Sequence, residues 1–252
     1  MRSSGLNGAS AALVGDAGSV FGNPAGLATI RHIALEGAFR REPGGRRATT
    51  AAGAWRLRQF DLGGGIQSVL GGAGPDERLI TGSAIYRFGL IAAGASAKWI
   101  GSRQGGVTSR AWGADWGMAI AIFDIMAIGF SMQNVGGNQV DGSTVVLPRL
   151  TRLGFTMNYV DPQESFRLLS SLEVQWPESR RSRFVAGGEA GTVIKGVGVV
   201  GRLAYGSPWP GYHPSSMTYG GSVVLGRLIA DYAYEPSLLS VSRHRLGLRL
   251  TF

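Results

Sequence analysis

"RLGLRLTF", residues 245–252, alternates strictly with a period of two at the end of the chain. One face of the predicted strand carries four apolar residues, Leu246, Leu248, Leu250 and Phe252. The other face carries arginine, glycine and threonine. Because successive side chains of a β-strand point to opposite faces, the stretch predicts a strand that is apolar on one side and polar on the other.

The same alternation recurs along nearly the whole chain, for example in residues 91–99, 149–159, 165–176 and 228–235. Turn residues separate the alternating stretches, at 42–46, 71–77, 103–106, 135–143, 161–165, 177–180 and 207–215. Counting from Thr29 to Phe252 gives about fourteen strands of about 9 to 12 residues, the length that crosses a bilayer at the tilt of a barrel.

The composition narrows the fold class further. The 252 residues include 41 glycines, 44% are hydrophobic and only 16% are charged, which is unusual for a soluble surface. No stretch reaches the roughly 18 to 20 consecutive apolar residues of a transmembrane helix. A soluble β-sandwich is the alternative, but its strands average about five or six residues. Aromatic residues stand where membrane-interface girdles would fall, at Trp55, Tyr86, Trp99, Trp112, Tyr159, Trp176 and Tyr205. We therefore predict an all-β, antiparallel transmembrane β-barrel of about 14 strands.

Several other function classes are disfavoured by the residues. The chain has no cysteine, and its three histidines, His32, His213 and His244, are not at metal-binding spacing. No nucleophile elbow or phosphate loop is present, so we expect no enzyme activity, no metal and no cofactor. The net charge is +9, but the basic residues are scattered, and we expect no nucleic-acid binding.

The first 28 residues lack strand alternation. "GDAGSVFGNPAGLA", residues 15–28, is rich in small residues, and Pro24 cannot donate a ladder hydrogen bond, so Gly22 to Gly26 is a predicted turn. We predict that residues 1–28 fold into the lumen as a plug and that residues 29–252 form the barrel. An exposed flexible tail is the alternative. No apolar signal region follows Met1, and we expect the natural start to lie upstream.

Charged residues on the polar face of the strands are predicted to point into the lumen, because ionisable groups in membrane proteins face the interior and find partners there. The predicted lumenal charges are Glu36, Arg40, Asp61, Lys98, Asp115, Arg152, Arg167, Glu173, Glu189, Arg202, Asp231 and Arg249. Their mixed signs favour a closed, internally ion-paired barrel or a small polar path over an apolar conduit.

"RSSGLNGASAALVGDAGSVFGNPAGLA", residues 2–28, resembles the start of the PorV/PorQ family of outer-membrane barrels. The matching positions are Arg2, Gly5, Gly8, Ala9, Asp16, Asn23, Pro24, Ala25, Gly26 and Leu27. The stretches 113–118, 133–137, 147–155 and 231–236 also resemble that family. More distantly, the chain is similar to long-chain fatty-acid transporters of the FadL type, which share the Asn-Pro-Ala turn and a barrel of the same strand number.

The resemblance implies a bacterial outer-membrane barrel of fourteen antiparallel strands with an N-terminal plug whose turn motif is Asp16, Asn23, Pro24, Ala25, Gly26 and Leu27. Phe252 resembles the terminal aromatic residue that serves as an assembly signal. FadL-type barrels pass hydrophobic molecules and open sideways at a kinked third strand, which implies a lateral opening at Gly63, Gly64 and Gly65. The alternative is that these glycines make room for the plug.

Two functions follow from the resemblance. The FadL type implies transport of a small hydrophobic molecule, although this chain is too short for the long loops that capture fatty acids. The PorV type implies a docking or structural component of an envelope or protein-secretion complex. The expected partners are the lipid bilayer together with either a hydrophobic ligand or lipid, or other envelope proteins.

Overall fold

The computed structural model describes residues 1–123, 125–140, 147–161, 165–178, 180–208, 216–236 and 242–252. Within these ranges the helices are α1 (Arg2–Gly5) and the 3-10 helices η1 (Ala17–Phe21), η2 (Pro24–Thr29) and η3 (Pro43–Gly45). The strands are β1 (Ile33–Arg41), β2 (Arg47–Leu57), β3 (Phe60–Leu70), β4 (Asp76–Phe88), β5 (Ile91–Gln104), β6 (Val107–Ile122), β7 (Met126–Val140), β8 (Leu150–Val160), β9 (Phe166–Pro177), β10 (Arg183–Ile194), β11 (Val197–Gly206), β12 (Met217–Leu225), β13 (Leu228–Glu235) and β14 (Arg243–Thr251).

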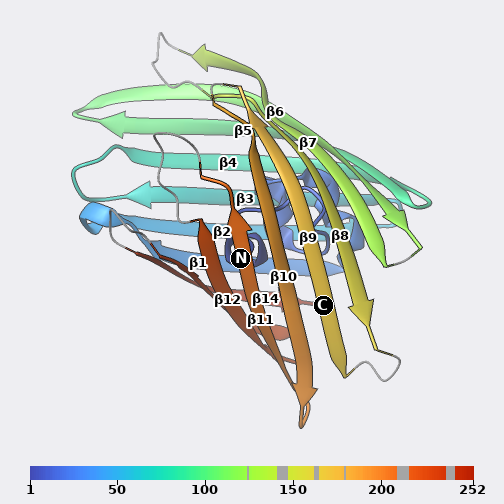
Figure 1. Ribbon diagram of the computed structural model, residues 1–252. Coiled ribbons are helices and arrows are strands. Elements are labelled where there is room, and N and C mark those ends of the chain that lie inside the picture. Colours follow the sequence, from blue (N-terminus) through green and yellow to red (C-terminus); the bar gives the residue numbers. More distant parts are fainter. Residues whose placement is uncertain (124, 141–146, 162–164, 179, 209–215, 237–241) are drawn as a thin grey trace.

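The fourteen strands of the described residues form one closed antiparallel barrel (Figure 1). Each strand pairs with its neighbours in sequence, and β1 pairs with β14 to close the wall, with Leu35 opposite Leu250. This confirms the predicted fold class. The first strand begins at Ile33 rather than at residue 29, because η2 continues to Thr29.

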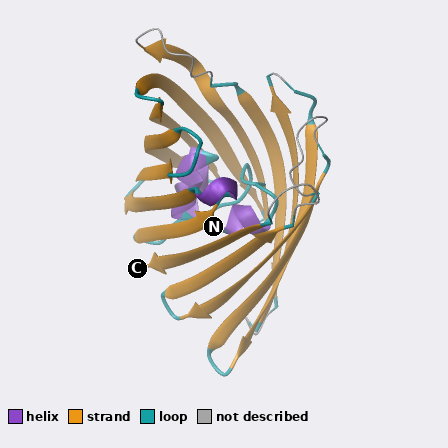
Figure 2. Cartoon of the chain, turned by 90° about the vertical axis from the view of Figure 1, so that its left-hand side faces the viewer, coloured by secondary structure: helices purple, strands orange, loops and turns teal. Residues whose placement is uncertain are grey.

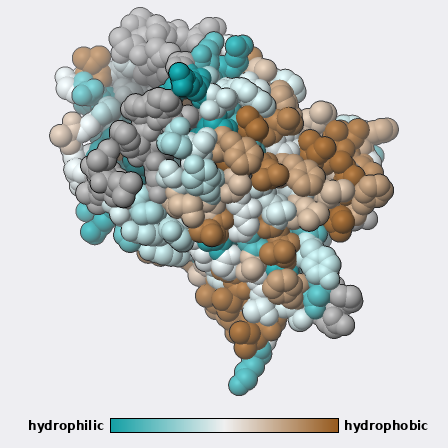
Figure 3. All heavy atoms as spheres, in the orientation of Figure 1, coloured by the Kyte–Doolittle hydropathy of each residue, from teal (hydrophilic) through white to brown (hydrophobic). Residues whose placement is uncertain are grey.

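The predicted two-residue alternation sets the two faces of the wall. In β14, Leu246 and Leu248 are among the large hydrophobic residues exposed on the outside, whereas Arg245 and Arg249 line cavities inside the barrel. Such exposed apolar side chains gather over the outer surface of the strands (Figure 3). An apolar outer face suits contact with lipid hydrocarbon. None of the helices in the described part of the chain is long and apolar enough to cross a membrane.

The two ends of the barrel differ in their connections. One end, here called the turn side, carries the start of β1, the end of β14 and four two-residue turns, at 58–59, 89–90, 195–196 and 226–227. The opposite end, here called the loop side, carries most of the longer connections. This asymmetry is typical of outer-membrane barrels, whose longer loops face the outside of the cell.

The turn predicted at residues 135–143 begins later than expected, because β7 continues to Val140; residues 141–143 lie outside the described residues. The backbone takes positive φ at Asn134 (61°) and Gly136 (64°), and the β6–β7 register shifts between Trp112 and Trp116. The Asp115 Oδ1 atom accepts the Asn134 N–H at 2.8 Å. Asn134 and Gly136 therefore produce an irregularity within the β6–β7 hairpin.

The wall is not equally high all round. Strands β4 to β7 contain 13, 14, 16 and 15 residues, whereas β12, β13, β14 and β1 contain 9, 8, 9 and 9. The low part of the wall includes the β1–β14 pair that closes the barrel.

Candidate functional site

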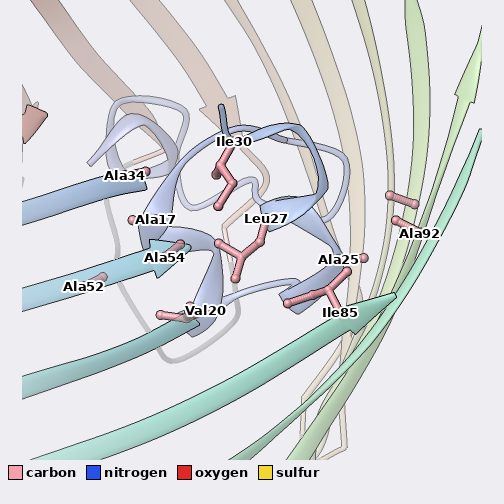
Figure 4. Packing of buried hydrophobic residues seen from close by; sticks show 11 residues of the cluster. Ala17, Val20, Ala25, Leu27, Ile30, Ala34, Ala52, Ala54, Ile85 and Ala92 are labelled. Carbon is pink, nitrogen blue, oxygen red and sulfur yellow. The ribbon is translucent and has the colours of Figure 1, made fainter. Parts of the chain in front are cut away.

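Residues 1–30, here called the N-terminal segment, lie against the inner face of the wall (Figure 2). Their apolar side chains form two clusters with wall residues. In the first, Val20, Leu27 and Ile30 pack among alanines of β1, β2, β5 and β6 and against Ile85 of β4 (Figure 4). In the second, Leu6 and Leu13 of the segment pack with Leu169, Val185 and Ala204. Burial of these side chains removes apolar surface from water and stabilises the segment inside the barrel.

The Asn-Pro turn connects the segment to the wall. The Asn23 Oδ1 atom accepts the Ala25 N–H at 3.0 Å, and Pro24 begins η2. The Asn23 side chain thus satisfies a backbone N–H of the first turn, as helix caps usually do. Pro24 suits the first helical position because its nitrogen has no hydrogen to donate. The Asn23 Nδ2 group donates to the Ala11 carbonyl at 2.5 Å and to the Met118 carbonyl of β6 at 3.2 Å. One fully buried amide thus caps η2 and ties it to another part of the segment and to the barrel.

Glycines of the wall leave space for the backbone of the segment. A Cβ atom at Gly129 of β7 would lie 2.7 Å from the Ala12 Cα atom, and one at Gly154 of β8 would lie 3.1 Å from the Ala12 nitrogen. Any side chain at Gly129 would therefore require the segment backbone to move.

Gly63 and Gly65 serve the segment in a similar way. A Cβ at Gly63 would lie 2.7 Å from Val20 Cγ1, and one at Gly65 would lie 3.0 Å from Phe21 Cε1. Gly64 faces the other side, and the three residues pair with β2 and β4 without a register shift. These contacts favour the interpretation that the glycines make room for the segment. The ladder has no gap at this point that would correspond to the predicted lateral opening.

A lumenal ion-pair network crosses the barrel between the segment and β10, β11, β13 and β14. It joins three guanidinium groups to three carboxylates, those of Arg2, Asp16, Glu189, Arg202, Asp231 and Arg249. Arg202 lies 3.0 Å from Glu189 and 3.2 Å from Asp231, and Arg249 lies 2.6 Å from Asp231. Arg249 also pairs with Asp16, and Arg2 pairs with Glu189. The network thus fastens both Arg2 and Asp16 of the segment to the wall.

Asp16 precedes the first strand and is held ionised by its neighbours. Burial would raise the pKa of the Asp16 carboxyl, but the positive charges of Arg249 and Arg2 outweigh burial and hold this pKa below its ordinary value. The ion pairs of Asp16 therefore stabilise the folded protein fully at pH values above the ordinary carboxyl pKa. This stabilisation is lost only when the pH falls through the lowered pKa.

Other predicted lumenal charges also contact the segment. The Glu173 Oε2 atom accepts the backbone N–H groups of Ser10 and Ala11, each at 2.7 Å, and Arg152 lies 3.5 Å from Glu173. Arg152 also donates to the Gly8 carbonyl at 3.0 Å. The Glu36 carboxylate accepts the Gly18 N–H at 2.9 Å.

Three of the predicted lumenal residues, Lys98, Asp115 and Arg167, have partners outside the segment. Lys98 and Asp115 form a buried ion pair at 2.6 Å between β5 and β6. Arg167 donates to the Asn158 Oδ1 atom at 2.6 Å near the turn side. Asp61, which sequence reasoning also predicts to face the lumen, is buried. Sequence reasoning did not single out its partners Arg56 and Arg87, which pair with it at 3.4 and 2.8 Å. The alternation of Asp61 with Phe60 and Leu62 is the pattern that predicts its inward direction.

Phe252 lies at the end of β14, where its N–H donates to the Ile33 carbonyl at 2.9 Å. Its ring is 45% exposed, and the Arg227 guanidinium lies 5.7 Å from the ring centroid. The position suits contact with lipid headgroups, and the assembly role of Phe252 stays a prediction.

Two cavities lie on opposite sides of the segment. The loop-side cavity has a volume of about 280 Å³, and the segment contributes Ser4, Asn7 and Gly8 to its lining. The turn-side cavity has a volume of about 610 Å³, and its lining includes Arg2, Asp16 and Thr29. Among the residues that the structure describes, no group of three or more His, Asp or Glu side chains could hold a metal ion.

The fold defines the chain as a 14-stranded antiparallel β-barrel with an apolar outer face and a charged interior. Solved structures share this architecture. The Ralstonia pickettii toluene transporter TbuX superposes with a TM-score of 0.65 at 14% identity, covering 99% of this chain and 97% of its own. A Pseudomonas aeruginosa FadL homologue gives 0.62 at 12% identity, with the same coverage. The Acinetobacter baumannii outer membrane protein Omp33 gives 0.54 at 8% identity, covering 88% and 98% of the two chains.

At these identities the likeness shows a shared fold. The predicted similarity to FadL-type barrels is confirmed at that level. No family model matches the chain, and no curated protein sequence matches it. Membership of the PorV/PorQ family therefore stays a prediction.

Proposed function

We propose that the protein spans the bacterial outer membrane and passes small molecules, with the N-terminal segment as a plug that moves during passage. The observation that carries the proposal is the position of the segment between two cavities that face opposite ends of the barrel. The apolar outer face and the fold shared with the outer membrane protein Omp33 support the location. The fold shared with the toluene transporter TbuX supports a transport role.

The observations indicate less about the chemistry of the solute than about its path through the barrel. The names of the similar proteins favour a hydrophobic molecule, as the FadL resemblance implies. The cavity linings favour a solute with a polar or charged group, because arginines are the most numerous charged residues in both of them. A small organic molecule with an apolar body and one polar group satisfies both observations.

The proposal is tested by tying the plug to the wall. The chain has no cysteine, so the pair Ala11→Cys and Gly154→Cys introduces the only thiols. A Cβ at Gly154 would lie 3.0 Å from the Ala11 Cβ atom, slightly closer than the roughly 3.5–4.5 Å of a disulfide, and a small shift accommodates the bond. In planar bilayers containing KCl, we expect conductance when the disulfide is reduced and its loss when the disulfide is oxidised.

The single variant Ala11→Cys is the matched control, and its conductance should not respond to oxidation. Equal conductance of the oxidised and reduced double variant would contradict a moving plug. Failure of the unmodified protein, and of both forms of the double variant, to conduct ions or release entrapped solutes from liposomes would contradict transport itself.

The docking function stays a second prediction from the PorV resemblance. It is tested by purifying the tagged protein from its native membrane in mild detergent and identifying the proteins that accompany it in stoichiometric amount. A constant partner would favour docking, whereas a barrel that carries only lipid would favour transport.

A further inference from the structure

The loop-side cavity carries an excess of positive charge. Four guanidinium groups and one carboxylate line it, those of Arg40, Arg183, Arg243, Arg245 and Glu235. Glu42 lies beside the cavity and pairs with Arg40 and Arg243. Even with Glu42 included, four cations face two anions. The neighbouring sequence stretches 207–216 and 236–242 contain no Asp or Glu that could balance the charge.

Arg245 is the centre of this excess. Its Nη1 group donates to the Ser4 hydroxyl, and no ion pair connects it to a carboxylate among the described residues. In the β1–β14 ladder it stands directly opposite Arg40. Like charges opposite one another on neighbouring strands destabilise a sheet, and a partly buried guanidinium without a counter-charge is costly. An anion between the two arginines would relieve both costs.

One arginine of the cavity lining also has an N–H donor that makes no hydrogen bond among the described residues. The Nε–H group of Arg40 is buried and has no hydrogen-bond partner, whereas the Arg243 Nε atom, which makes no hydrogen bond either, lies 3.3 Å from the Glu42 carboxylate. Guanidinium groups present planar N–H pairs that match the oxygens of carboxylates and phosphates. The volume of about 280 Å³ corresponds to about nine water molecules at roughly 30 Å³ each, which is enough for a small oxyanion group.

We propose that the loop-side cavity binds an oxyanion, the phosphate or carboxylate group of a small solute, between Arg40, Arg243 and Arg245. The role of this site rests on the proposed function: it is the point where a solute enters the barrel from the loop side. Anion binding is measured without transport. A negative binding result therefore contradicts the anion site alone, and a negative transport result contradicts the proposed function alone.

The test is calorimetric titration of the full chain, folded in detergent, with inorganic phosphate and with succinate. We expect saturable binding of at least one of the two, and no binding of the neutral analogue succinamide. The substitution Arg245→Gln should raise the dissociation constant of the anion about tenfold or more, because a charge-assisted hydrogen bond to the anion is lost. The matched control Arg47→Gln, an exposed arginine beside the same end of the wall, should change the dissociation constant less than about twofold.

Arg245→Lys keeps the positive charge but lacks the planar pair of N–H donors. Its affinity for the anion should therefore lie between those of the wild type and Arg245→Gln. Arg40→Gln gives an independent reading if Arg245→Gln does not fold, as judged by the mobility of the unboiled protein in detergent gels. Binding of phosphate alone would assign a phosphate group, and binding of succinate alone a carboxylate. Absence of saturable binding of both anions, or equal binding by wild type, Arg245→Lys and Arg40→Gln, would overturn the proposal.

Discussion

Arg249→Met should lower the free energy of unfolding of the barrel by about 3–5 kcal/mol, the usual cost of removing one partner from a buried ion pair. Arg249 pairs with Asp231 and with Asp16, whose side chains are 1% and 13% exposed. Without Arg249, the ion pairs left among the described residues are Asp231 with Arg202 at 3.2 Å and Asp16 with Arg2 at 3.8 Å, and Asp231 keeps the Ser222 hydroxyl. The loss is measured by urea titration of the detergent-folded protein, followed by tryptophan fluorescence.

The double variant Arg249→Met/Asp231→Asn separates pairing from packing. It removes the carboxylate that the single variant leaves short of a partner, so its loss of stability should be smaller than the sum of the two single losses. Arg47→Met is the exposed control and should change the free energy of unfolding by less than about 0.5 kcal/mol. A loss below about 1 kcal/mol for Arg249→Met would mean that the network contributes little to stability.

Gly129→Ala should displace the N-terminal segment and cost about 1–3 kcal/mol, because the added methyl group meets backbone atoms of Ala11 and Ala12 and not a flexible side chain. Gly82→Ala is the matched control: it also lies within a strand, on the outer face, where a Cβ would meet no atom within 4 Å. Limited proteolysis reports the position of the segment, and thermal unfolding reports the cost.

We expect cleavage within residues 1–30 to be much faster in Gly129→Ala than in Gly82→Ala. Equal cleavage rates and equal unfolding temperatures would show that the segment is not held closely against β7. In that case the ion pairs, and not the close backbone contact, would be the main attachment.

The strands could be predicted from sequence because their alternation is a local property. Leu246 and Arg249 are only three residues apart, and the alternation already places them on opposite faces of the strand. The partners of each charge could not be predicted, because they depend on register and closure. Arg249 meets Asp231 across the β13–β14 pair, and it meets Asp16 only because the first residues fold inside the barrel.

The glycines illustrate the same limit. A glycine run inside a strand permits a bulge or a close neighbour, and the sequence alone does not distinguish them. At Gly63 and Gly65 the neighbour is the N-terminal segment, whereas at Gly136 and Gly137 the glycines accompany a register shift between β6 and β7. The identity of the neighbour is a tertiary property.

The unequal height of the wall has a consequence for the surrounding lipid. At a rise of about 3.4 Å per residue and a tilt of about 40°, the eight residues of β13 reach about 20 Å along the membrane normal and the sixteen of β6 about 40 Å. The hydrocarbon layer is about 30 Å thick, so in a barrel that spans the membrane as proposed, lipids beside β12, β13, β14 and β1 would shorten to match the protein. The barrel would therefore carry an annulus of uneven thickness, thinnest at the seam where its first and last strands meet.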